Sequence, residues 1–357
     1  MRNRWAEVDL GVLRRNVVAL RRRLRTGCRF IAVVKADGYG HGAVPVARAA
    51  IDAGADMLAV ATLTEAAEVA SLVERPDQVL VMGGLLPAEA DVAAAGGYSV
   101  GCASIEVARA LAATGAPLDV HVKVDTGMTR FGAAPMTAAE VARVVAGSSR
   151  LRLAGAWSHL AASESDPAFT RQQLERFLAA VETLPQRPPL LHIANSGAVL
   201  NHPEAVLDAV RVGIAMYGCE APGVTEPVLS WRARIGHVQR IPSGTPVGYG
   251  SSWRAGRLSC IATVSMGYAD GVHRTRSNRG WCLVNGRKAG LVGRVSMDSL
   301  TLDVTEIDQV TVGDAVTLIG DDGGERIIAE DVARWSETIS YEVLTSIGRR
   351  VERTYRD

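Results

Sequence analysis

Short apolar runs alternate with alanine-rich stretches of helical pattern through the first two thirds of the chain. Several of these runs contain no polar position, which is typical of strands buried on both faces of a parallel sheet. Alternating strands and helices indicate parallel pairing, and eight such units over roughly 200 residues predict a closed (β/α)8 barrel. The expected barrel strands are Phe30–Lys35, Met57–Ala61, Val79–Gly83, Tyr98–Cys102, Asp119–Asp125, Leu151–His159, Leu190–Asn195 and Val210–Ile214.

The pattern changes near the segment 221–227, which is rich in proline and glycine. Beyond it, strand-like runs follow one another closely and are separated by turn signals such as Asn285-Gly286, which predicts a smaller and mostly antiparallel β domain. We expect the barrel over residues 1–225 and the β domain over residues 226–357, with Trp5–Leu10 pairing with the second domain. The expected strands of that domain are Trp231–Ile241, Leu258–Met266, Trp281–Val284, Leu300–Val304 and Ala315–Ile319.

Composition and charge exclude several classes of protein. The chain of 357 residues carries a formal net charge of +1, which gives no overall attraction to nucleic acid or to an anionic membrane. The arginine-rich segment 14–25 has the spacing of an amphipathic helix and no aromatic interleaving, so we interpret it as a solvated helix face.

The five cysteines are scattered, and no two of them form a Cys-x-x-Cys pair. This usage disfavours a disulfide framework and a metal site, and suits a reducing compartment. The N-terminal sequence lacks the apolar core of a signal peptide, and no apolar run approaches membrane-spanning length. We therefore expect a soluble cytoplasmic protein without a metal.

One lysine stands where a buried strand is expected to end. The apolar run from Phe30 to Val34 leads into Lys35, and the glycine-rich loop 36–42 follows at once. Partial desolvation at such a position lowers the pKa of the amine and favours Schiff-base formation. The alternative is a strand-end lysine that merely extends to solvent.

Other polar groups are expected on the same rim, because functional groups of a (β/α)8 barrel gather at the C-terminal ends of its strands. Arg130 follows the fifth expected strand, His159 closes the sixth, Ser196 follows the seventh and Arg211 lies in the eighth. Each is a weak signal alone, but together with Lys35 they favour one common site.

The first and the last two barrel loops offer donors suited to a phosphate. Tyr39 and Ser196 supply hydroxyl groups, and Gly213 and Ile214 supply backbone N–H groups that a ligand can approach closely. A phosphate site beside a lysine that forms Schiff bases points to pyridoxal 5′-phosphate (PLP). From spacing alone, an aldolase-type lysine is the main alternative.

Motifs along nearly the whole chain resemble those of the alanine racemase family. The lysine motif and the Gly-Tyr-Ala-Asp-Gly motif, in this order, are highly specific together. The segments that carry the resemblance are Val34-Lys35-Ala-Asp-Gly-Tyr-Gly-His-Gly42, Val122-Lys-Val-Asp-Thr-Gly-Met128 with Arg130, Ile193-Ala-Asn-Ser196, Arg211-Val-Gly-Ile-Ala-Met-Tyr-Gly218, Gly267-Tyr-Ala-Asp-Gly271, Gly293-Arg-Val-Ser-Met-Asp298 and Tyr341-Glu-Val-Leu-Thr-Ser-Ile347.

The resemblance implies a PLP-dependent isomerase that interconverts L-alanine and D-alanine, with D-alanine supplied for the cell wall. Lys35 would hold PLP covalently, and Arg211 would face the pyridine nitrogen. Because a guanidinium group donates hydrogen bonds without giving up its proton, the pyridine stays a weak electron sink, which disfavours transamination. The phosphate would be bound by Tyr39, Ser196, Gly213, Ile214 and Tyr341.

Racemisation requires a base on each face of the α-carbon. The resemblance implies that Lys35 serves D-alanine and that Tyr268 serves L-alanine. A free tyrosine has a pKa near 10, and His159 and Arg211 would form a hydrogen-bonded chain behind Tyr268.

The resemblance also implies a homodimer with shared active sites, because this family takes Tyr268 and Met297 from the partner subunit. Arg130 and the backbone of Met297 would hold the substrate carboxylate. Lys123 matches a lysine that the family carries as a carbamate, an anion able to orient Arg130.

The chain departs from the family pattern near the pocket. Thr129 replaces the usual glycine before Arg130, and Leu160 stands where an aromatic residue is common, which affects expectations of turnover and substrate range. The other departures are Gly38 for alanine, and Ser265 and Ser340 where proline is frequent.

Three other functions are alternatives to alanine racemisation. A related PLP racemase would prefer serine or another small amino acid, although Tyr341 favours alanine by narrowing the pocket. A PLP-binding protein without turnover would lack the second domain and the Tyr268 motif. A basic amino acid decarboxylase would show a glycine-rich phosphate loop and a C-terminal cysteine motif, and the sequence has neither.

Overall fold

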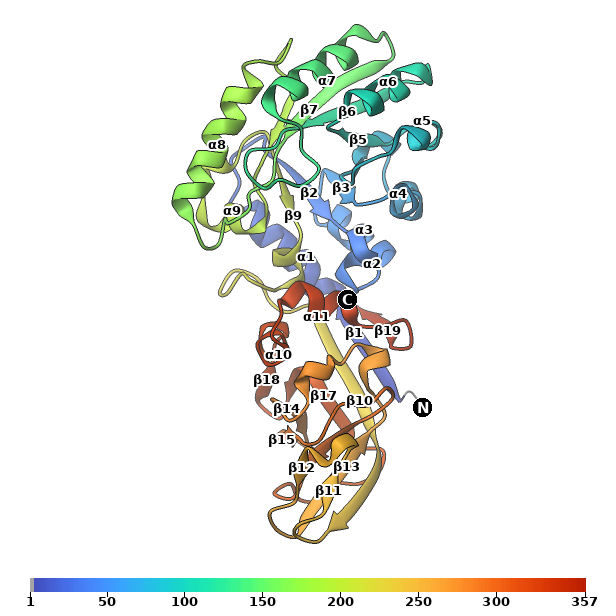
Figure 1. Ribbon diagram of the computed structural model, residues 1–357, viewed down its shortest axis with the longest axis vertical. Coiled ribbons are helices and arrows are strands. Elements are labelled where there is room, and N and C mark those ends of the chain that lie inside the picture. Colours follow the sequence, from blue (N-terminus) through green and yellow to red (C-terminus); the bar gives the residue numbers. More distant parts are fainter. Residues whose placement is uncertain (1–2) are drawn as a thin grey trace.

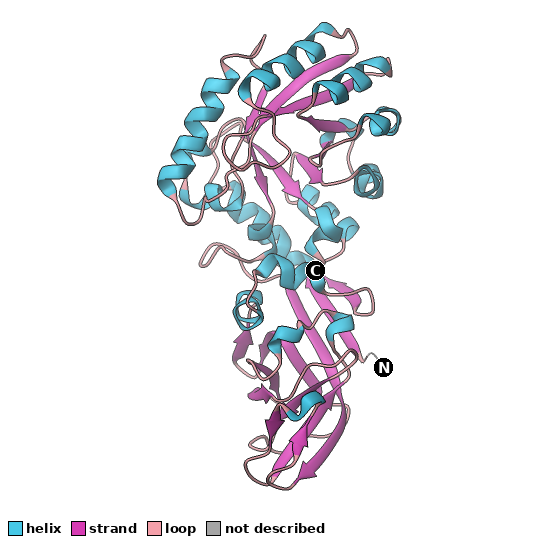
Figure 2. Ribbon diagram, in the orientation of Figure 1, coloured by secondary structure: helices cyan, strands magenta, loops and turns pink. Residues whose placement is uncertain are grey.

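The molecule has two parts of different secondary structure, which lie one above the other along its long axis (Figure 1). The computed structural model describes residues 3–357, so residues 1–2 of the expected barrel range lie outside the described part. Helices surround strands in the upper body, whereas the lower body consists mainly of strands (Figure 2). The predicted fold class, a barrel with an antiparallel β domain, is confirmed.

Eight parallel strands within the described residues form the barrel, in the order β8-β7-β6-β5-β4-β3-β2-β9. Between β8 and β9, the N–H groups of Asp208 and Arg211 donate to the carbonyls of Leu191 and Ala194 at 3.0 and 2.9 Å, which closes the ring. The strands are β2 (Arg29–Val33), β3 (Met57–Val60), β4 (Val79–Val81), β5 (Ser99–Cys102), β6 (Leu118–Lys123), β7 (Leu151–Trp157), β8 (Leu190–His192) and β9 (Ala209–Val212).

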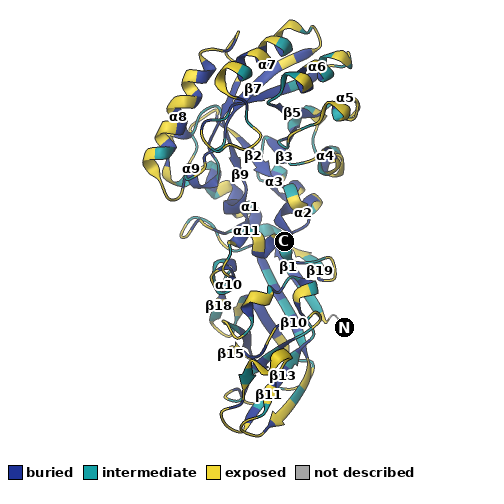
Figure 3. Ribbon diagram, in the orientation of Figure 1, coloured by how far each residue is buried: buried dark blue, intermediate teal, exposed yellow. Residues whose placement is uncertain are grey.

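Helices cover the outer faces of these strands, with their buried sides inward and their exposed sides in solvent (Figure 3). The expected basic helix is α1, which buries Leu13, Val17 and Leu20, while its three arginines are partly or fully exposed. No helix among residues 3–357 has both the length and the apolar character needed to cross a membrane. The barrel helices are α1 (Leu10–Arg21), α2 (Lys35–Tyr39), α3 (Ala43–Asp52), α4 (Leu63–Val69), α5 (Ala90–Gly96), α6 (Ile105–Ala113), α7 (Pro135–Gly147), α8 (Pro167–Val181) and α9 (Ser196–Asn201).

The second sheet joins the beginning of the chain to its end. Strand β1 (Arg4–Asp9) pairs antiparallel with β10 (Leu229–Ile241) and parallel with β19 (Glu352–Arg356). Across the described residues the sheet has nine strands, in the order β18-β17-β14-β15-β16-β13-β10-β1-β19. Its other strands are β13 (Ser259–Val264), β14 (Trp281–Val284), β15 (Arg287–Leu291), β16 (Leu300–Asp303), β17 (Ala315–Asp322) and β18 (Glu325–Ile327); β11 (Pro246–Val247) and β12 (Trp253–Arg254) form a separate pair, and helices α10 (Ala329–Ser336) and α11 (Ser340–Ser346) precede β19.

The hairpin β14–β15 turns where the sequence predicted it. Asn285 and Gly286 have φ angles of +49° and +74°, the backbone that a two-residue hairpin turn requires. Strands β15, β18 and β19 were not predicted, because charged and exposed positions outnumber the buried ones in them.

Candidate active site

Lys35 lies two residues beyond the end of β2, at the first residue of α2, rather than within the strand as predicted. The residues from Ala36 to Gly40 all have positive φ angles, between +52° and +78°. This left-handed turn is closed by the Gly40 N–H, which donates to the Ala36 carbonyl at 2.9 Å. A non-glycine residue in this conformation costs about 1–2 kcal/mol, so the surrounding packing holds the backbone in a strained form beside the lysine.

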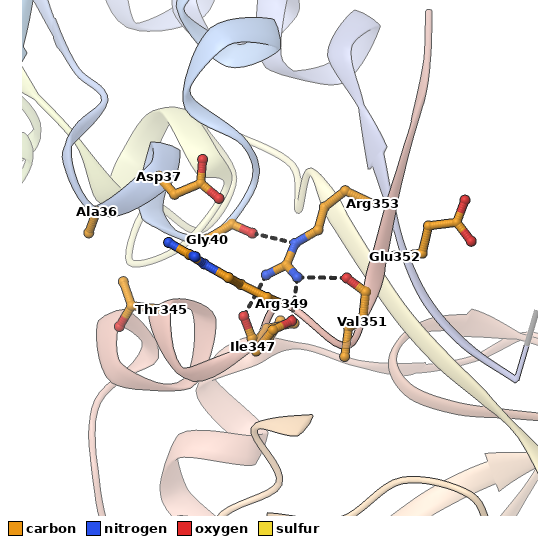
Figure 4. A pocket seen from close by; sticks show the side chains of 10 residues that line it. Ala36, Asp37, Gly40, Thr345, Ile347, Arg349, Val351, Glu352 and Arg353 are labelled. Atoms are coloured by element: carbon orange, nitrogen blue, oxygen red, sulfur yellow. Dashed lines mark hydrogen bonds between the residues drawn. The ribbon is translucent and has the colours of Figure 1, made fainter. Parts of the chain in front are cut away.

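Arg353 of β19 fastens this turn to the C-terminal segment. Its guanidinium donates to the Gly40 carbonyl at 3.1 Å and to the carbonyls of Gly348 and Val351 at 2.6 and 2.7 Å. The same group lines a cleft of about 620 Å³ beneath the turn (Figure 4). A Cβ at Gly40 would lie 2.3 Å from the carbonyl oxygen of Leu344, so α11 is in close contact with the turn.

Close packing also brings together the predicted phosphate-binding groups. The Ser196 hydroxyl accepts from the Gly213 N–H at 3.1 Å and from the Ala215 N–H at 3.4 Å. Ala215 lies in the short turn η5 (Ile214–Tyr217). A Cβ at Gly213 would lie 2.5 Å from the Tyr39 hydroxyl, and the Tyr39 and Tyr341 rings are 5.9 Å apart. Burial raises the pKa of Tyr39 to about 12, so its hydroxyl remains a donor.

Arg211 is buried among acceptors inside the barrel. Its guanidinium donates to the Ser158 carbonyl at 2.7 Å, to the His192 carbonyl at 2.9 Å and to His192 Nδ1 at 2.8 Å, and it reaches His159 Nδ1 at 3.3 Å. It also lies 4.7 Å from the ring centroid of Trp157. Burial lowers the pKa of Arg211 to about 9, which leaves the group protonated at neutral pH and a donor only.

A second buried histidine extends this network away from the rim. Arg211 cannot accept a hydrogen bond, so His192 Nδ1 accepts, and the His192 proton lies on Nε2. His192 Nε2–H therefore donates to His121 Nδ1 at 2.9 Å. Since His121 Nδ1 accepts, the proton of His121 also lies on Nε2, and both imidazoles are neutral. Burial, followed by the charge of Arg152, lowers the pKa of His121 to about 3. His121 also lines a cavity of about 170 Å³ at the other end of the barrel.

Sequence reasoning did not identify His121, His192 or Trp157. One available signal was that His121 and Lys123 are two residues apart in one strand and therefore share a face. In the barrel, Lys123 pairs with Trp157 and Trp157 with His192 across neighbouring strands, which places all three beside Arg211.

Positive charges are concentrated on this rim. Burial and the charge of Arg130 lower the pKa of Lys35. Burial, then Arg211 and Arg130, lower the pKa of Lys123 to about 8, and its amine lies 4.2 Å from the ring centroid of Trp157. Burial and then Arg211 hold the pKa of His159 well below its ordinary value, so the site presents cations around a neutral imidazole.

Arg130 lies on an exposed loop built around Asp125. The Asp125 carboxylate accepts from the N–H groups of Gly127, Met128 and Thr129 at 2.8, 3.1 and 3.1 Å. Thr129, which departs from the family pattern, has a φ of +56°, a conformation that favours glycine and is unusual for a β-branched residue.

Tyr268 and Met297 lie on turns of the β domain, where they are 43% and 53% exposed. The backbone joins the two turns, because Tyr268 N–H donates to Ser296 O and Ala269 N–H to Met297 O, both at 3.0 Å. Within residues 3–357, neither side chain makes a hydrogen bond to the barrel-rim groups.

Comparison with known proteins decides the family. The family described as "Alanine racemase, N-terminal domain" matches residues 8–221, and "Alanine racemase, C-terminal domain" matches residues 228–355. The chain belongs to the alanine racemase family. The alanine racemase of Symbiobacterium thermophilum is 43% identical to it, over 99% of this chain and 97% of the relative.

Solved structures agree with the sequence comparison. The alanine racemase from E. faecalis superimposes with a TM-score of 0.92 at 34% identity, covering 99% of this chain and 98% of that one. The alanine racemase from Bartonella henselae, described with covalently bound pyridoxal phosphate, matches over 100% of both chains with a TM-score of 0.92 at 29% identity. Alanine racemases are PLP-dependent isomerases, so the predicted enzyme class and cofactor are confirmed.

The rim fits PLP on its own geometry. Hydroxyl and N–H donors surround the space next to Gly213, where a Cβ would collide with Tyr39. Lys35 has a desolvated amine near this space, and Arg211 is a donor that suits an unprotonated pyridine nitrogen.

Proposed function

We propose that this chain is an alanine racemase that interconverts L-alanine and D-alanine as a homodimer. The proposal rests on two groups that occur in the same site. The amine of Lys35 is desolvated, and the buried Arg211 can only donate hydrogen bonds. A carboxylate in place of Arg211 would stabilise a protonated pyridine nitrogen by accepting its hydrogen bond, and would favour other PLP reactions.

The barrel residues have distinct proposed roles. Lys35 holds the cofactor covalently, Arg211 donates to its pyridine nitrogen, and the phosphate is bound by Tyr39, Ser196, Gly213, Ile214 and Tyr341. Bound PLP supplies an electron-withdrawing ring system that acidifies the α-proton of the substrate. Because Arg211 keeps its proton, this withdrawal stays moderate, which suits return of the proton to the α-carbon.

Two bases on opposite faces move the proton. The Lys35 amine exchanges the α-proton of D-alanine, and the partner's Tyr268 exchanges that of L-alanine. His159 accepts from Arg211 through Nδ1, so its Nε2 carries a hydrogen that can donate to the tyrosine oxygen after the proton has left.

The β domain is proposed to complete the site of the partner subunit. Tyr268 and Met297 are exposed on one chain, as groups presented to a partner would be. In this proposal the barrel spans residues 1–225 and the β domain residues 226–357, and Arg130 with the Met297 backbone binds the substrate carboxylate.

Lys123 is proposed to carry a carbamate. Its lowered pKa increases the fraction of neutral amine, whose nitrogen attacks carbon dioxide and loses one proton to give an anion. That anion would offset the surrounding cations and orient Arg130. Mass spectrometry of native protein labelled with ¹³C-bicarbonate tests this, and an unlabelled Lys123 contradicts it.

An activity assay tests the proposed function directly. The purified protein with PLP should convert L-alanine to D-alanine, and the reverse, to an equimolar mixture. A panel with serine and other small amino acids then measures substrate range. Absence of interconversion of alanine in either direction refutes the proposal. If D-alanine feeds cytoplasmic cell-wall synthesis, a deletion strain lacking other racemases will require added D-alanine to grow.

A further inference from the structure

The motif that contains Tyr268 ends in a buried carboxylate. Asp270 is 0% exposed, and its Oδ2 accepts from the Gly267 N–H at 2.9 Å, which folds the turn 267–271 back on itself. Its Oδ1 receives Arg4 Nη1 at 2.6 Å and Arg350 Nε at 3.1 Å. A carboxylate buried this completely is stable only because both guanidinium groups and the N–H satisfy it.

Arg350 connects this turn to the one that carries Met297. Its Nη1 donates to Asp298 Oδ1 at 2.7 Å, while its Nε holds Asp270. The turns also touch through their backbones, because a Cβ at Gly267 would lie 2.3 Å from Ser296 O. The two turns therefore move as one unit.

The ion pairs come from segments that are distant in sequence. Arg4 belongs to β1 at the beginning of the chain, and Arg350 precedes β19 at its end. Both reach Asp270, and Tyr268, two residues earlier, is left exposed. The arrangement fixes the backbone of the turn without occupying the tyrosine side chain.

We infer that Asp270, Arg4 and Arg350 form a clamp that positions Tyr268 and Met297 for the partner's active site. The inference rests on the proposed catalytic role of Tyr268. These three are positioning residues, because they act through the turn and touch neither substrate nor cofactor. Loosening the clamp should displace the tyrosine oxygen, and a displacement of about 1 Å at a reacting group lowers rate by as much as about a hundredfold.

The test separates the two faces of the reaction. Holoenzyme in D2O is given L-alanine or D-alanine at saturating concentration, so that weaker carboxylate binding by the Met297 backbone raises KM for both substrates without lowering the measured rate. The initial exchange of the α-proton is followed by NMR. Asp270→Asn and Arg350→Met should each slow L-alanine exchange by about ten- to a hundredfold and leave D-alanine exchange, dimer mass and the PLP absorbance within about twofold of wild type. Arg356→Gln is the matched control, because Arg356 forms exposed ion pairs with Glu7 and Asp9 at the same sheet edge and should change neither rate.

Equal losses on both substrates would show a general structural role and overturn the clamp, as would unchanged L-alanine exchange in both variants. If Asp270→Asn does not fold, Arg350→Met alone decides, because its side chain is partly exposed and its loss leaves Arg4 on Asp270. Tyr268→Phe is measured in parallel. Should Tyr268→Phe retain L-alanine exchange, the two-base proposal itself fails; should it lose exchange while both clamp variants keep it, only the clamp fails.

Discussion

Gly213→Ala should weaken PLP binding by filling the space beside the proposed phosphate site. The new Cβ would lie 2.5 Å from the Tyr39 hydroxyl oxygen and 3.0 Å from the ring carbon that bears it. Tyr39 is buried between Tyr217 and Tyr341, whose ring centroids are 4.9 and 5.9 Å away, so it cannot simply swing aside.

The size of the effect follows from two contributions. Overpacking in a dense region costs about 1–3 kcal/mol, which should appear as lower stability of the apoenzyme. Displacing the hydroxyl also loses one hydrogen bond to a charged phosphate, which contributes about 1.5–3 kcal/mol. At about 1.4 kcal/mol per tenfold, the Kd for PLP should rise about ten- to a hundredfold.

Titration of apoenzyme with PLP, followed by absorbance, measures this Kd, and thermal unfolding of the apoenzyme measures the packing cost. Gly147→Ala is the matched control, because a Cβ there would have no atom within 4 Å. Tyr39→Phe removes the atom at 2.5 Å, so the double variant should recover part of the stability lost in Gly213→Ala. Wild-type PLP affinity in Gly213→Ala, or no recovery in the double variant, would refute the packing argument.

Three further predictions concern single side chains. Lys35→Ala should abolish both the yellow colour of bound PLP and racemisation; activity in a colourless variant would contradict its role. Thr129→Gly should raise unfolding stability by up to about 1 kcal/mol, because φ is +56° there, whereas Thr129→Ala should give no gain in denaturant unfolding. Buried His121 has a pKa of about 3, below its unfolded value near 6.5, so the unfolded state binds its proton first and stability falls as pH falls from 6.5 to 3. His121→Gln should lower that slope by up to about 1.4 kcal/mol per pH unit in urea unfolding, and an unchanged slope would disprove the assignment.

The barrel could be predicted because most of its strands are short runs dominated by apolar residues, which leave little choice of partner or face. Strands β15, β18 and β19 could not, since charged residues with few buried positions gain their pairing from neighbours rather than from their own pattern. Strand β2 ends at Val33, two residues before the predicted end at Lys35, and the left-handed turn follows from Ala36.

The polar rim was predictable from one rule, that strand ends carry the chemistry. His192 and Trp157 are the last residues of β8 and β7, but the predicted strands ran on to Asn195 and His159, so the rule pointed past them. Only the register between strands aligns them with Lys123. The clamp on Tyr268 was equally hidden, since Arg4 and Asp270 are separated by 266 positions in the sequence.

The placement of β1 between β10 and β19 has a consequence for how the protein is made. Strand β1 is synthesised before the barrel, yet its partners begin at residues 229 and 352, so it waits unpaired while the entire barrel is synthesised. Closure of the β domain is then tied to synthesis of residues 352–356, and a product that stops before residue 350 lacks Arg350 and β19. Such a product would keep its lysine and barrel but would expose an open sheet edge, a surface that promotes aggregation and marks the truncated chain for removal.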